Sequence, residues 1–244
     1  MNKGTCLQTY TAIRIEPRSG AEMISSLLFG ESYQIIEKNN GWLKIIADYD
    51  QYSGWISESN HNEFIEFPQI VTSLYCKAST KDKTLYIPCG GKIPSNDKLI
   101  IDGETYQIYH NLKGYEHLPL HLRIVKTAKS FLNAPYLWGG KSFMGIDCSG
   151  LVQMVLKSEN VFVPRDTSQQ IKMGNTISFQ EIKTGDLVFF SSPDKDNVSH
   201  VAMVTNGNEI IHSSGKVRID KLEKDGIHFN NALKYKLLDI KRVI

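Results

Sequence analysis

The spacing of apolar residues changes once along this 244-residue chain, near Tyr115, and this change restricts the possible folds more than any other feature. Before it, apolar residues occur in short runs separated by turn residues, which is typical of short β-strands. After it, the spacing becomes helical and is followed by further strand-like runs. We therefore expect an α+β chain, with β-units first and a mixed domain beginning at about residue 114.

The first half divides into two sets of strand-like runs. The first set, TAIRIEP, SYQIIEKNNGWLKIIADY and YSGWIS, contains a hairpin turn at 39–41. The second, SLYCKA, KTLYIPCGG and DKLIIDGETYQIY, contains another at Asp102-Gly103. Strands this short predict small barrels, so we expect one barrel over residues 1–58 and a second over 59–113.

The second half is predicted to form one domain over residues 114–244. One helical face comprises Ile124, Val125, Ala128, Phe131 and Leu132. A second helix is expected after Asp147, with an apolar stripe that runs from Leu151 to Leu156 and ends near Asn160. Three strand-like runs follow, GDLVFF, HVAMVT and EIIHSS, and they predict an antiparallel sheet.

Composition excludes several classes of protein. With 41% hydrophobic and 22% charged residues, neither disorder nor a coiled coil is expected. A net charge of +2 gives no basic surface of the kind that nucleic-acid binding needs. The sequence contains neither an apolar run long enough to span a membrane nor a secretory signal, so we expect a cytoplasmic protein, or a secreted one if a leader was removed.

The four cysteines, Cys6, Cys76, Cys89 and Cys148, are too sparse for a disulfide scaffold and have no metal-binding spacing. Reduced thiols are the expectation, with a bond between Cys76 and Cys89 left open. We treat the first three as small buried side chains.

Cys148 differs because it lies at the predicted start of a helix, within GGKSFMGIDCSGL. The helix dipole there favours the thiolate, which is the reactive form. Asp147 is the better N-cap, and this leaves the Cys148 side chain available as a nucleophile. A zinc site with His200 and His212 is the alternative, but no further ligand has suitable spacing, so we expect neither metal nor cofactor.

A thiol nucleophile needs a base that a third group orients, and His200 and His212 are candidates on two successive strands. A two-residue turn at Asn206-Gly207 would put them on opposite faces. A three-residue loop, Asn206 to Asn208, would pair Ala202 with His212 and put both on one face, about 7–8 Å apart. The catalytic hypothesis therefore predicts the longer loop, with His200 as base and His212 as its orienter.

The motifs PYLWGG, IDCSGLV, PRDTSQQ, GDLVFF and HVAMV, followed by IIHSS, resemble the catalytic domain of the NlpC/P60 cysteine peptidases, which has a papain-like fold. LFGE and YSGWI in the first barrel resemble a bacterial SH3 domain. Two such barrels before this domain are similar to the arrangement in γ-D-glutamyl-L-diamino acid endopeptidases, also called dipeptidyl-peptidase VI. These enzymes act on murein peptides.

The resemblance implies roles for particular residues. Cys148, His200 and His212 match the catalytic three, and the Tyr136 hydroxyl with the Cys148 N–H would form the oxyanion hole. Arg165 would pair with the α-carboxylate of a γ-linked D-glutamate. The residues implied in binding the rest of the substrate, including its N-terminal amine, are Glu31, Tyr52, Trp138, Asp147, Ser149, Asp166 and Thr167. Thr167 departs from the serine that many relatives carry.

The function implied is hydrolysis of the γ-D-glutamyl-diamino acid bond in short murein peptides with a free N-terminal L-Ala, by a monomer that takes part in peptidoglycan recycling. Two other functions stay open. One is a secreted hydrolase that acts on intact peptidoglycan stems, and the other is a non-catalytic or acyl-transferring relative.

Overall fold

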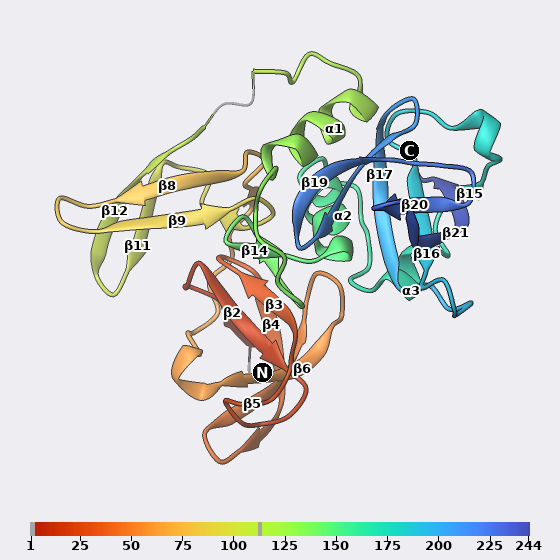
Figure 1. Cartoon of the computed structure of the whole chain (residues 1–244). Coiled ribbons are helices and arrows are strands. Elements are labelled where there is room, and N and C mark those ends of the chain that lie inside the picture. Colours follow the sequence, from red (N-terminus) through yellow and green to blue (C-terminus); the bar gives the residue numbers. More distant parts are fainter. Residues whose placement is uncertain (1–2, 112–113) are drawn as a thin grey trace. The chain divides into compact units, whose positions relative to one another are not determined.

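The computed structural model describes residues 3–111 and 114–244, and the chain divides into two units (Figure 1). One unit consists of Met1–Lys113 with Leu137–Gly145, and the other of Gly114–Tyr136 with Ile146–Ile244. The change near residue 114 therefore coincides with a boundary between units. The second unit is not continuous in sequence, however, because the segment Leu137–Gly145 belongs to the first.

The first sheet has the strand order β1-β4-β5-β6-β2-β3. Its strands are β1 (Lys3–Thr5), β2 (Tyr10–Arg14), β3 (Met23–Leu28), β4 (Ser32–Asn39), β5 (Trp42–Ala47) and β6 (Ser53–Ser57), followed by the 3-10 turn η1 (Glu58–Asn60). Asn39 pairs with Trp42, so Asn40 and Gly41 form the turn, with φ of 44° and 78°. The predicted hairpin is confirmed, since Asn and Gly tolerate positive φ at both turn positions.

The second set of strands forms a sheet ordered β11-β12-β8-β9 and a separate pair, β10-β7. Their bounds are β7 (Gln69–Ile70), β8 (Tyr75–Ser79), β9 (Thr84–Pro88), β10 (Lys92–Ile93), β11 (Lys98–Ile101) and β12 (Glu104–Tyr109). The Asp102-Gly103 turn is confirmed by the pairing of Ile101 with Glu104. Phe29, from the end of β3, packs into the core of this set with Phe67 and Ile87.

The expectation of two separate barrels is therefore not confirmed. The two sets share Phe29, and the Lys92 N–H donates to the Phe29 carbonyl at 2.8 Å. Gly30, next in the chain, has φ of +76°, and a Cβ there would lie 2.2 Å from the Lys92 carbonyl oxygen. This close backbone approach joins both sets into one unit.

The segment Leu137–Gly145 packs within the first unit through buried polar groups. It includes β13 (Lys141–Ser142) and the first residue of β14 (Gly145–Ile146). Ser26 donates to the Gly139 carbonyl, and Lys141 forms a buried ion pair with Glu31. This segment links two predicted site residues, Tyr136 and Cys148, so its ends lead directly into the candidate site.

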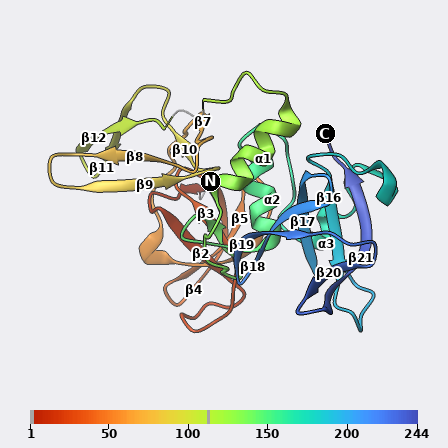
Figure 2. The ribbon, with the colours of Figure 1, turned by 45° about the horizontal axis from the view of Figure 1, so that its top comes forward.

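The second unit combines three helices with an antiparallel sheet ordered β15-β21-β16-β17-β18-β19, in which β20 also pairs with β21 (Figure 2). The helices are α1 (Leu120–Ser130), α2 (Cys148–Lys157) and α3 (Thr167–Gln170), with a 3-10 turn η2 (Phe179–Glu181). The strands are β15 (Asn175–Thr176), β16 (Leu187–Ser191), β17 (His200–Asn206), β18 (Glu209–Ser214), β19 (Lys216–Lys221), β20 (Gly226–Phe229) and β21 (Ala232–Arg242).

The two longer predicted helices are present, with differences at their ends and faces. In α1, Ile124, Val125 and Ala128 are buried as expected, but Leu132 is 40% exposed and lies beyond the helix. Helix α1 ends before it because Asn133 adopts a positive φ of 69°. Helix α2 is buried on every side instead of along a stripe, because it packs against α1, β17 and β18.

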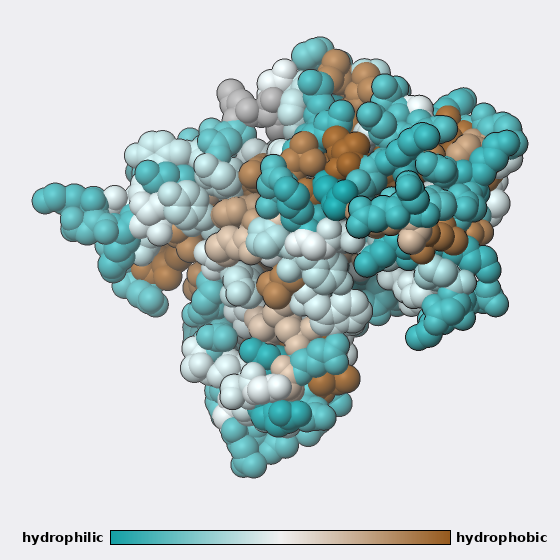
Figure 3. Space-filling view, viewed as in Figure 1, coloured by the Kyte–Doolittle hydropathy of each residue, from teal (hydrophilic) through white to brown (hydrophobic). Residues whose placement is uncertain are grey.

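The surface is largely hydrophilic on the face drawn in Figure 3, with smaller hydrophobic areas between polar ones. Exposed apolar side chains include Ile100 at 63% and Trp138 at 55%. In the part of the chain that the structure describes, none of the helices has the length and hydropathy to cross a membrane.

Candidate active site

The thiol of Cys148 lies at the first residue of α2, where Asp147 caps the helix. Asp147 is extended, with φ of −92° and ψ of 177°, and its Oδ1 accepts a 2.7 Å hydrogen bond from the Gly150 N–H. Ser213, next to His212 on β18, donates to the Ile146 carbonyl at 2.7 Å. The start of α2 is thereby attached to the strand that carries His212.

Burial dominates the electrostatics of the thiol. Cys148 is 6% exposed, and this burial, followed by the negative charge of Asp147, raises its pKa to about 11. Backbone N–H groups of Val201 and Ser149 and the charge of Arg165 oppose the shift without cancelling it. The expectation that this helix end favours the thiolate is therefore wrong, because desolvation of the charge outweighs the groups that would stabilise it.

This pKa predicts how Cys148 reacts with a small alkylating reagent. The thiolate fraction should rise about tenfold per pH unit up to about pH 11, so the rate of alkylation by iodoacetamide should keep rising from pH 7 to pH 10. Mass spectrometry of the modified peptide measures this rate, and circular dichroism checks that the fold persists. A rate that is constant between pH 6 and pH 9 would indicate a preformed thiolate instead.

The two histidines lie on one face of the sheet and contact each other. His200 Nε2 and His212 Nδ1 are 2.7 Å apart, and both rings are buried. Along β17 and β18, Met203 pairs with Ile211 and Val204 with Ile210, which is the register that we predicted for a catalytic pair. Their placement on a common face is confirmed.

The turn that produces this register differs from the predicted three-residue loop. Asn206 pairs with Glu209, so the turn residues are Gly207 and Asn208, and the register shifts by one residue at Thr205. A β-bulge at Thr205 supplies the extra residue, and its hydroxyl donates to the Glu209 carbonyl at 3.2 Å. One extra residue, whether in the loop or at a bulge, moves the side chains of β18 to the opposite face of the sheet and so brings His212 to the face of His200.

The surroundings of His200 favour the neutral form of its imidazole. Its ring stacks on Tyr235, with centroids 4.2 Å apart and planes 8° from parallel. The Tyr235 hydroxyl is held by Ser214 at 3.0 Å. Burial, and then the neighbouring His212, lower the pKa of His200 well below its ordinary value. Below about pH 6.5 the unfolded chain therefore binds the proton more readily, and this group contributes less to stability as the pH falls.

The polar contacts continue beyond the predicted three residues. His212 Nε2 lies 2.8 Å from Asp220 Oδ2, and Asp220 Oδ1 accepts a 2.7 Å hydrogen bond from Arg218. Both residues come from β19, which the sequence analysis did not predict. The alternation in KVRIDK was the available signal, because it places Arg218 and Asp220 on one face of a strand next to β18.

Tyr136, the predicted oxyanion-hole residue, lies at the edge of the same site. Its N–H donates to the Gly215 carbonyl at 3.0 Å, and it forms a bridge with Ile146. Burial, then the charges of Cys148 and Asp147, raise the pKa of its hydroxyl, which therefore remains protonated and able to donate. Its role in the oxyanion hole stays a prediction.

Arg165 is buried against the residues that begin α2. Arg165 is 2% exposed. Its Nη1 donates to Asp147 Oδ1 at 3.0 Å and its Nη2 donates to Asp147 Oδ2 at 2.5 Å. Nη1 also donates to the Ser149 hydroxyl at 2.7 Å. The fork geometry predicted for a substrate carboxylate is thus directed at the helix cap. Direct contact of Arg165, Asp147 or Ser149 with substrate stays a prediction.

Asp166 and Thr167 begin the short helix α3. Asp166 is its N-cap and forms a capping box with Gln169, and both Asp166 and Thr167 are half-buried. Gln170, at the end of α3, donates to the Ser149 carbonyl at 3.0 Å. This bond anchors α3 to the first turn of α2, next to Cys148.

Three predicted substrate-binding residues belong to the first unit. Glu31 is 3% exposed, and its Oε2 accepts hydrogen bonds from the Leu28 N–H at 2.8 Å and from Lys141 at 3.2 Å. Tyr52 is half-buried, and its N–H donates to Asp50. Trp138 is 55% exposed. Lys141, which neutralises Glu31, had no signal in the sequence.

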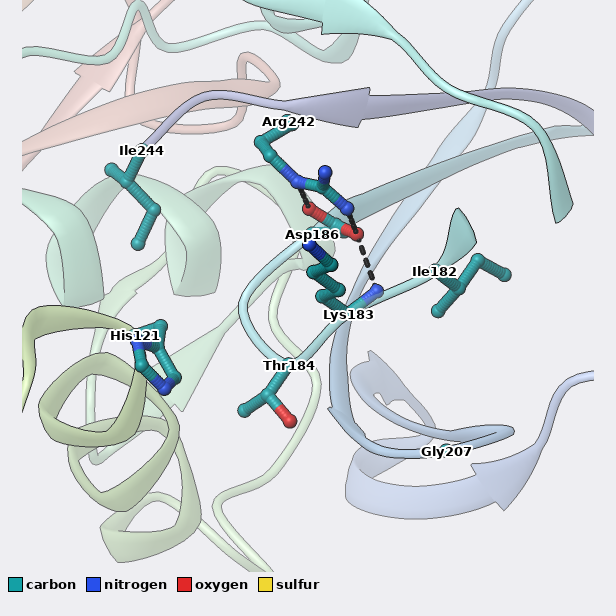
Figure 4. Close-up of a pocket in the computed structure, with 8 residues that line it drawn as sticks. All are labelled: His121, Ile182, Lys183, Thr184, Asp186, Gly207, Arg242 and Ile244. Carbon is teal, nitrogen blue, oxygen red and sulfur yellow. Dashed lines mark hydrogen bonds and ion pairs between the residues drawn. The ribbon is translucent and has the colours of Figure 1, made fainter. Parts of the chain in front are cut away.

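A cavity of about 440 Å³ in the second unit contains none of the predicted site residues (Figure 4). Asp186 and Arg242 form an ion pair in its wall, at 2.8 Å. The lining residues are His121, Ile182, Lys183, Thr184, Asp186, Gly207, Arg242 and Ile244. The catalytic candidates are thus assembled elsewhere, at the start of α2.

The alternatives for the cysteines can be compared with the structure. None of the four cysteines, all within the described residues, forms a disulfide, so Cys76 and Cys89 are not bonded to each other. Among the described residues, the ligating side chains close enough to share a metal ion are Glu223, Asp225 and His228. That group includes neither Cys148 nor the paired histidines.

Two family models match parts of this chain. A model described as the NlpC/P60 family matches residues 133–232, and one described as the bacterial dipeptidyl-peptidase SH3 domain matches residues 13–60. The second match corresponds to the first of the two predicted barrels.

Two curated relatives and one solved structure are similar over most of the chain. The γ-D-glutamyl-L-lysine dipeptidyl-peptidase of Bacillus subtilis is 38% identical, over 78% of this chain and 71% of that protein. Dipeptidyl-peptidase 6 of Lysinibacillus sphaericus is 26% identical, over 86% of this chain and 88% of its own. A crystal structure of an NlpC/P60 family protein from Bacillus cereus superposes with a TM-score of 0.80 at 20% identity, covering 99% of each chain.

Proposed function

Because the chain belongs to the NlpC/P60 family of cysteine peptidases, we propose that it hydrolyses the γ-D-glutamyl-diamino acid bond of short murein peptides and releases L-Ala-γ-D-Glu. The observation that carries the proposal is the contact between His200 and His212 beside the capped start of α2, where Cys148 lies. Two of the relatives are a γ-D-glutamyl-L-lysine dipeptidyl-peptidase and a dipeptidyl-peptidase 6, and these activities support the bond that we name.

The reaction begins from a neutral pair. Since the pKa of Cys148 is raised and that of His200 is lowered, the proton rests on sulfur until substrate binds. His200 then takes the Sγ proton as sulfur attacks the γ-carbonyl carbon, and the oxyanion is stabilised by the Tyr136 hydroxyl and the Cys148 N–H. His200 returns the proton to the leaving amine, and it activates the water that hydrolyses the acyl-enzyme.

Recognition of the substrate amine distinguishes a recycling enzyme from a wall hydrolase. We propose that Asp166 binds the free N-terminal ammonium and that Thr167 lines the peptide, while the substrate-binding roles of Glu31, Tyr52 and Trp138 in the first unit stay predictions. A requirement for a free amine selects short fragments over peptide stems that are still attached to glycan. We therefore place the reaction in the cytoplasm, as a step in peptidoglycan recycling.

The test compares L-Ala-γ-D-Glu-L-Lys with its N-acetylated form. Acetylation removes the ammonium charge and leaves its partners unpaired, so kcat/KM should fall roughly 10–100-fold. Chromatographic detection of L-Ala-γ-D-Glu measures cleavage, and the Cys148→Ala variant gives the background. Equal rates on both peptides, together with cleavage of intact peptidoglycan, would contradict the amine requirement and favour a wall hydrolase.

A further inference from the structure

The paired histidines are the inner part of a longer line of polar contacts that crosses three strands. His200 on β17 contacts His212 on β18 at 2.7 Å, and His212 contacts Asp220 on β19 at 2.8 Å. Arg218, also on β19, then donates to the second oxygen of Asp220 at 2.7 Å. Each link uses a different atom, so the four side chains can be bonded at the same time.

Burial decreases along this line toward the surface. The side chain of His212 is 0% exposed, that of Asp220 is 14% and that of Arg218 is 37%. Burial by itself would raise the pKa of Asp220, but its hydrogen bonds with His212 and Arg218 outweigh that effect and lower it. Asp220 is thus ionised at neutral pH and can only accept hydrogen bonds.

An ionised Asp220 determines where the protons lie on both imidazoles. A carboxylate that only accepts requires a proton on His212 Nε2, so neutral His212 presents a lone pair at Nδ1. That lone pair accepts a hydrogen bond from the Nε2–H of His200, the atom 2.7 Å away. Neutral His200 therefore carries its own lone pair on Nδ1.

We propose that Asp220 is a positioning residue that sets the tautomers of His212 and His200, so that Nδ1 of His200 is the atom that takes the proton from Cys148. This inference rests on the proposed function only in taking His200 as the base of Cys148. In the step, the Sγ–H bond breaks and an Nδ1–H bond forms, while the electron pair stays on sulfur. The positive charge that then develops on His200 is stabilised through His212 by the Asp220 carboxylate.

The other groups that face the histidines do not supply this function. Tyr235 on β21 stacks on His200 and bonds Ser214 through its hydroxyl. Arg218 bonds Asp220 from the opposite side. Of the described side chains with a hydrogen bond or ring contact to these histidines, Asp220 is the carboxylate.

The test replaces Asp220 by asparagine, which keeps the size but can donate to His212 Nε2 and so permit the other tautomer. In the parent enzyme, ¹⁵N NMR of the histidine rings should show both His200 and His212 protonated at Nε2. In Asp220→Asn, the tautomers should shift toward Nδ1–H, and kcat should fall about 10–100-fold with KM changed less than twofold. Asp220→Glu should recover part of kcat.

A matched control is Asp225→Asn, which removes a carboxylate that contacts His228 at 3.0 Å on the surface of the same unit. It should leave kcat and the His200 and His212 spectra unchanged. Unaltered tautomers and kcat in Asp220→Asn would overturn the proposal, and so would a parent spectrum with His212 protonated at Nδ1.

If Asp220→Asn does not fold, the NMR spectrum of the parent enzyme still tests the proposal, because it reports the tautomers of His200 and His212 directly. It separates this inference from the proposed function, because it needs no substrate. If the parent enzyme fails to cleave the murein tripeptide but shows the expected tautomers, the proposed substrate is wrong and the role of Asp220 stands.

Discussion

Replacement of Cys148 by alanine is expected to reduce kcat on L-Ala-γ-D-Glu-L-Lys by roughly 10⁴-fold or more, because loss of the nucleophile removes the covalent route entirely. The side chain is small and buried at 6% exposure, so the fold should persist. Steady-state assays of product release measure the effect, and thermal unfolding followed by circular dichroism confirms that the variant is folded.

Cys89→Ala is the matched control, since Cys89 is also a buried cysteine outside any disulfide but lies in the first unit. It should keep kcat within about twofold of the parent value, whatever its cost in stability. Comparable activity in the Cys148→Ala and parent enzymes would reject the mechanism, and equal losses in both alanine variants would point to a folding defect.

Replacement of Arg165 by methionine is expected to give the largest loss of stability, about 3–5 kcal/mol, because it leaves the carboxylate of Asp147 buried without its cation. Asp147 is 4% exposed and lies against Arg165 through two hydrogen bonds. Urea unfolding should show the loss in the second unit. All three tryptophans, Trp42, Trp55 and Trp138, lie in the first, so circular dichroism should report the loss more strongly than fluorescence.

Two further variants show whether the unpaired charge is the cause. Adding Asp147→Asn to Arg165→Met should restore part of the lost stability, since asparagine keeps an acceptor for the helix cap without the charge. Arg18→Met breaks an exposed ion pair with Glu16 and should cost at most about 1 kcal/mol. No recovery in the double variant would mean that Arg165 stabilises the protein by packing alone.

Local sequence signals predicted the individual elements well. The turns at Asn40-Gly41 and Asp102-Gly103 are confirmed, since positive φ at both positions is a property of those residue types. The strand that begins at His200 and the helix that begins at Cys148 also lie where their patterns placed them. Association of the strands into two barrels was not confirmed, because the packing of Phe29 between sets depends on contacts that no local pattern encodes.

The placement of His200 and His212 shows what strand periodicity can and cannot predict. The residue count between the two strands allowed either a common face or opposite faces, the catalytic hypothesis selected the common face, and the 2.7 Å contact agrees with it. The count could not say whether the extra residue lies in the loop or at a bulge, and the structure places it at Thr205. An extra residue in the loop and one at a bulge both place His212 on the face of His200. The catalytic hypothesis therefore predicted the register of the two strands but not the form of the turn.

What the sequence determined by itself is the local order: a cysteine after a capping aspartate at the start of a helix, two histidines on successive strands and the elements around them. Only the tertiary structure decided the charges and partners. It raised the pKa of Cys148 through burial, turned Arg165 toward Asp147, paired Glu31 with Lys141 and brought Asp220 to His212. These outcomes depend on desolvation and on contacts between distant segments, and neither is encoded in the spacing of residues along the chain.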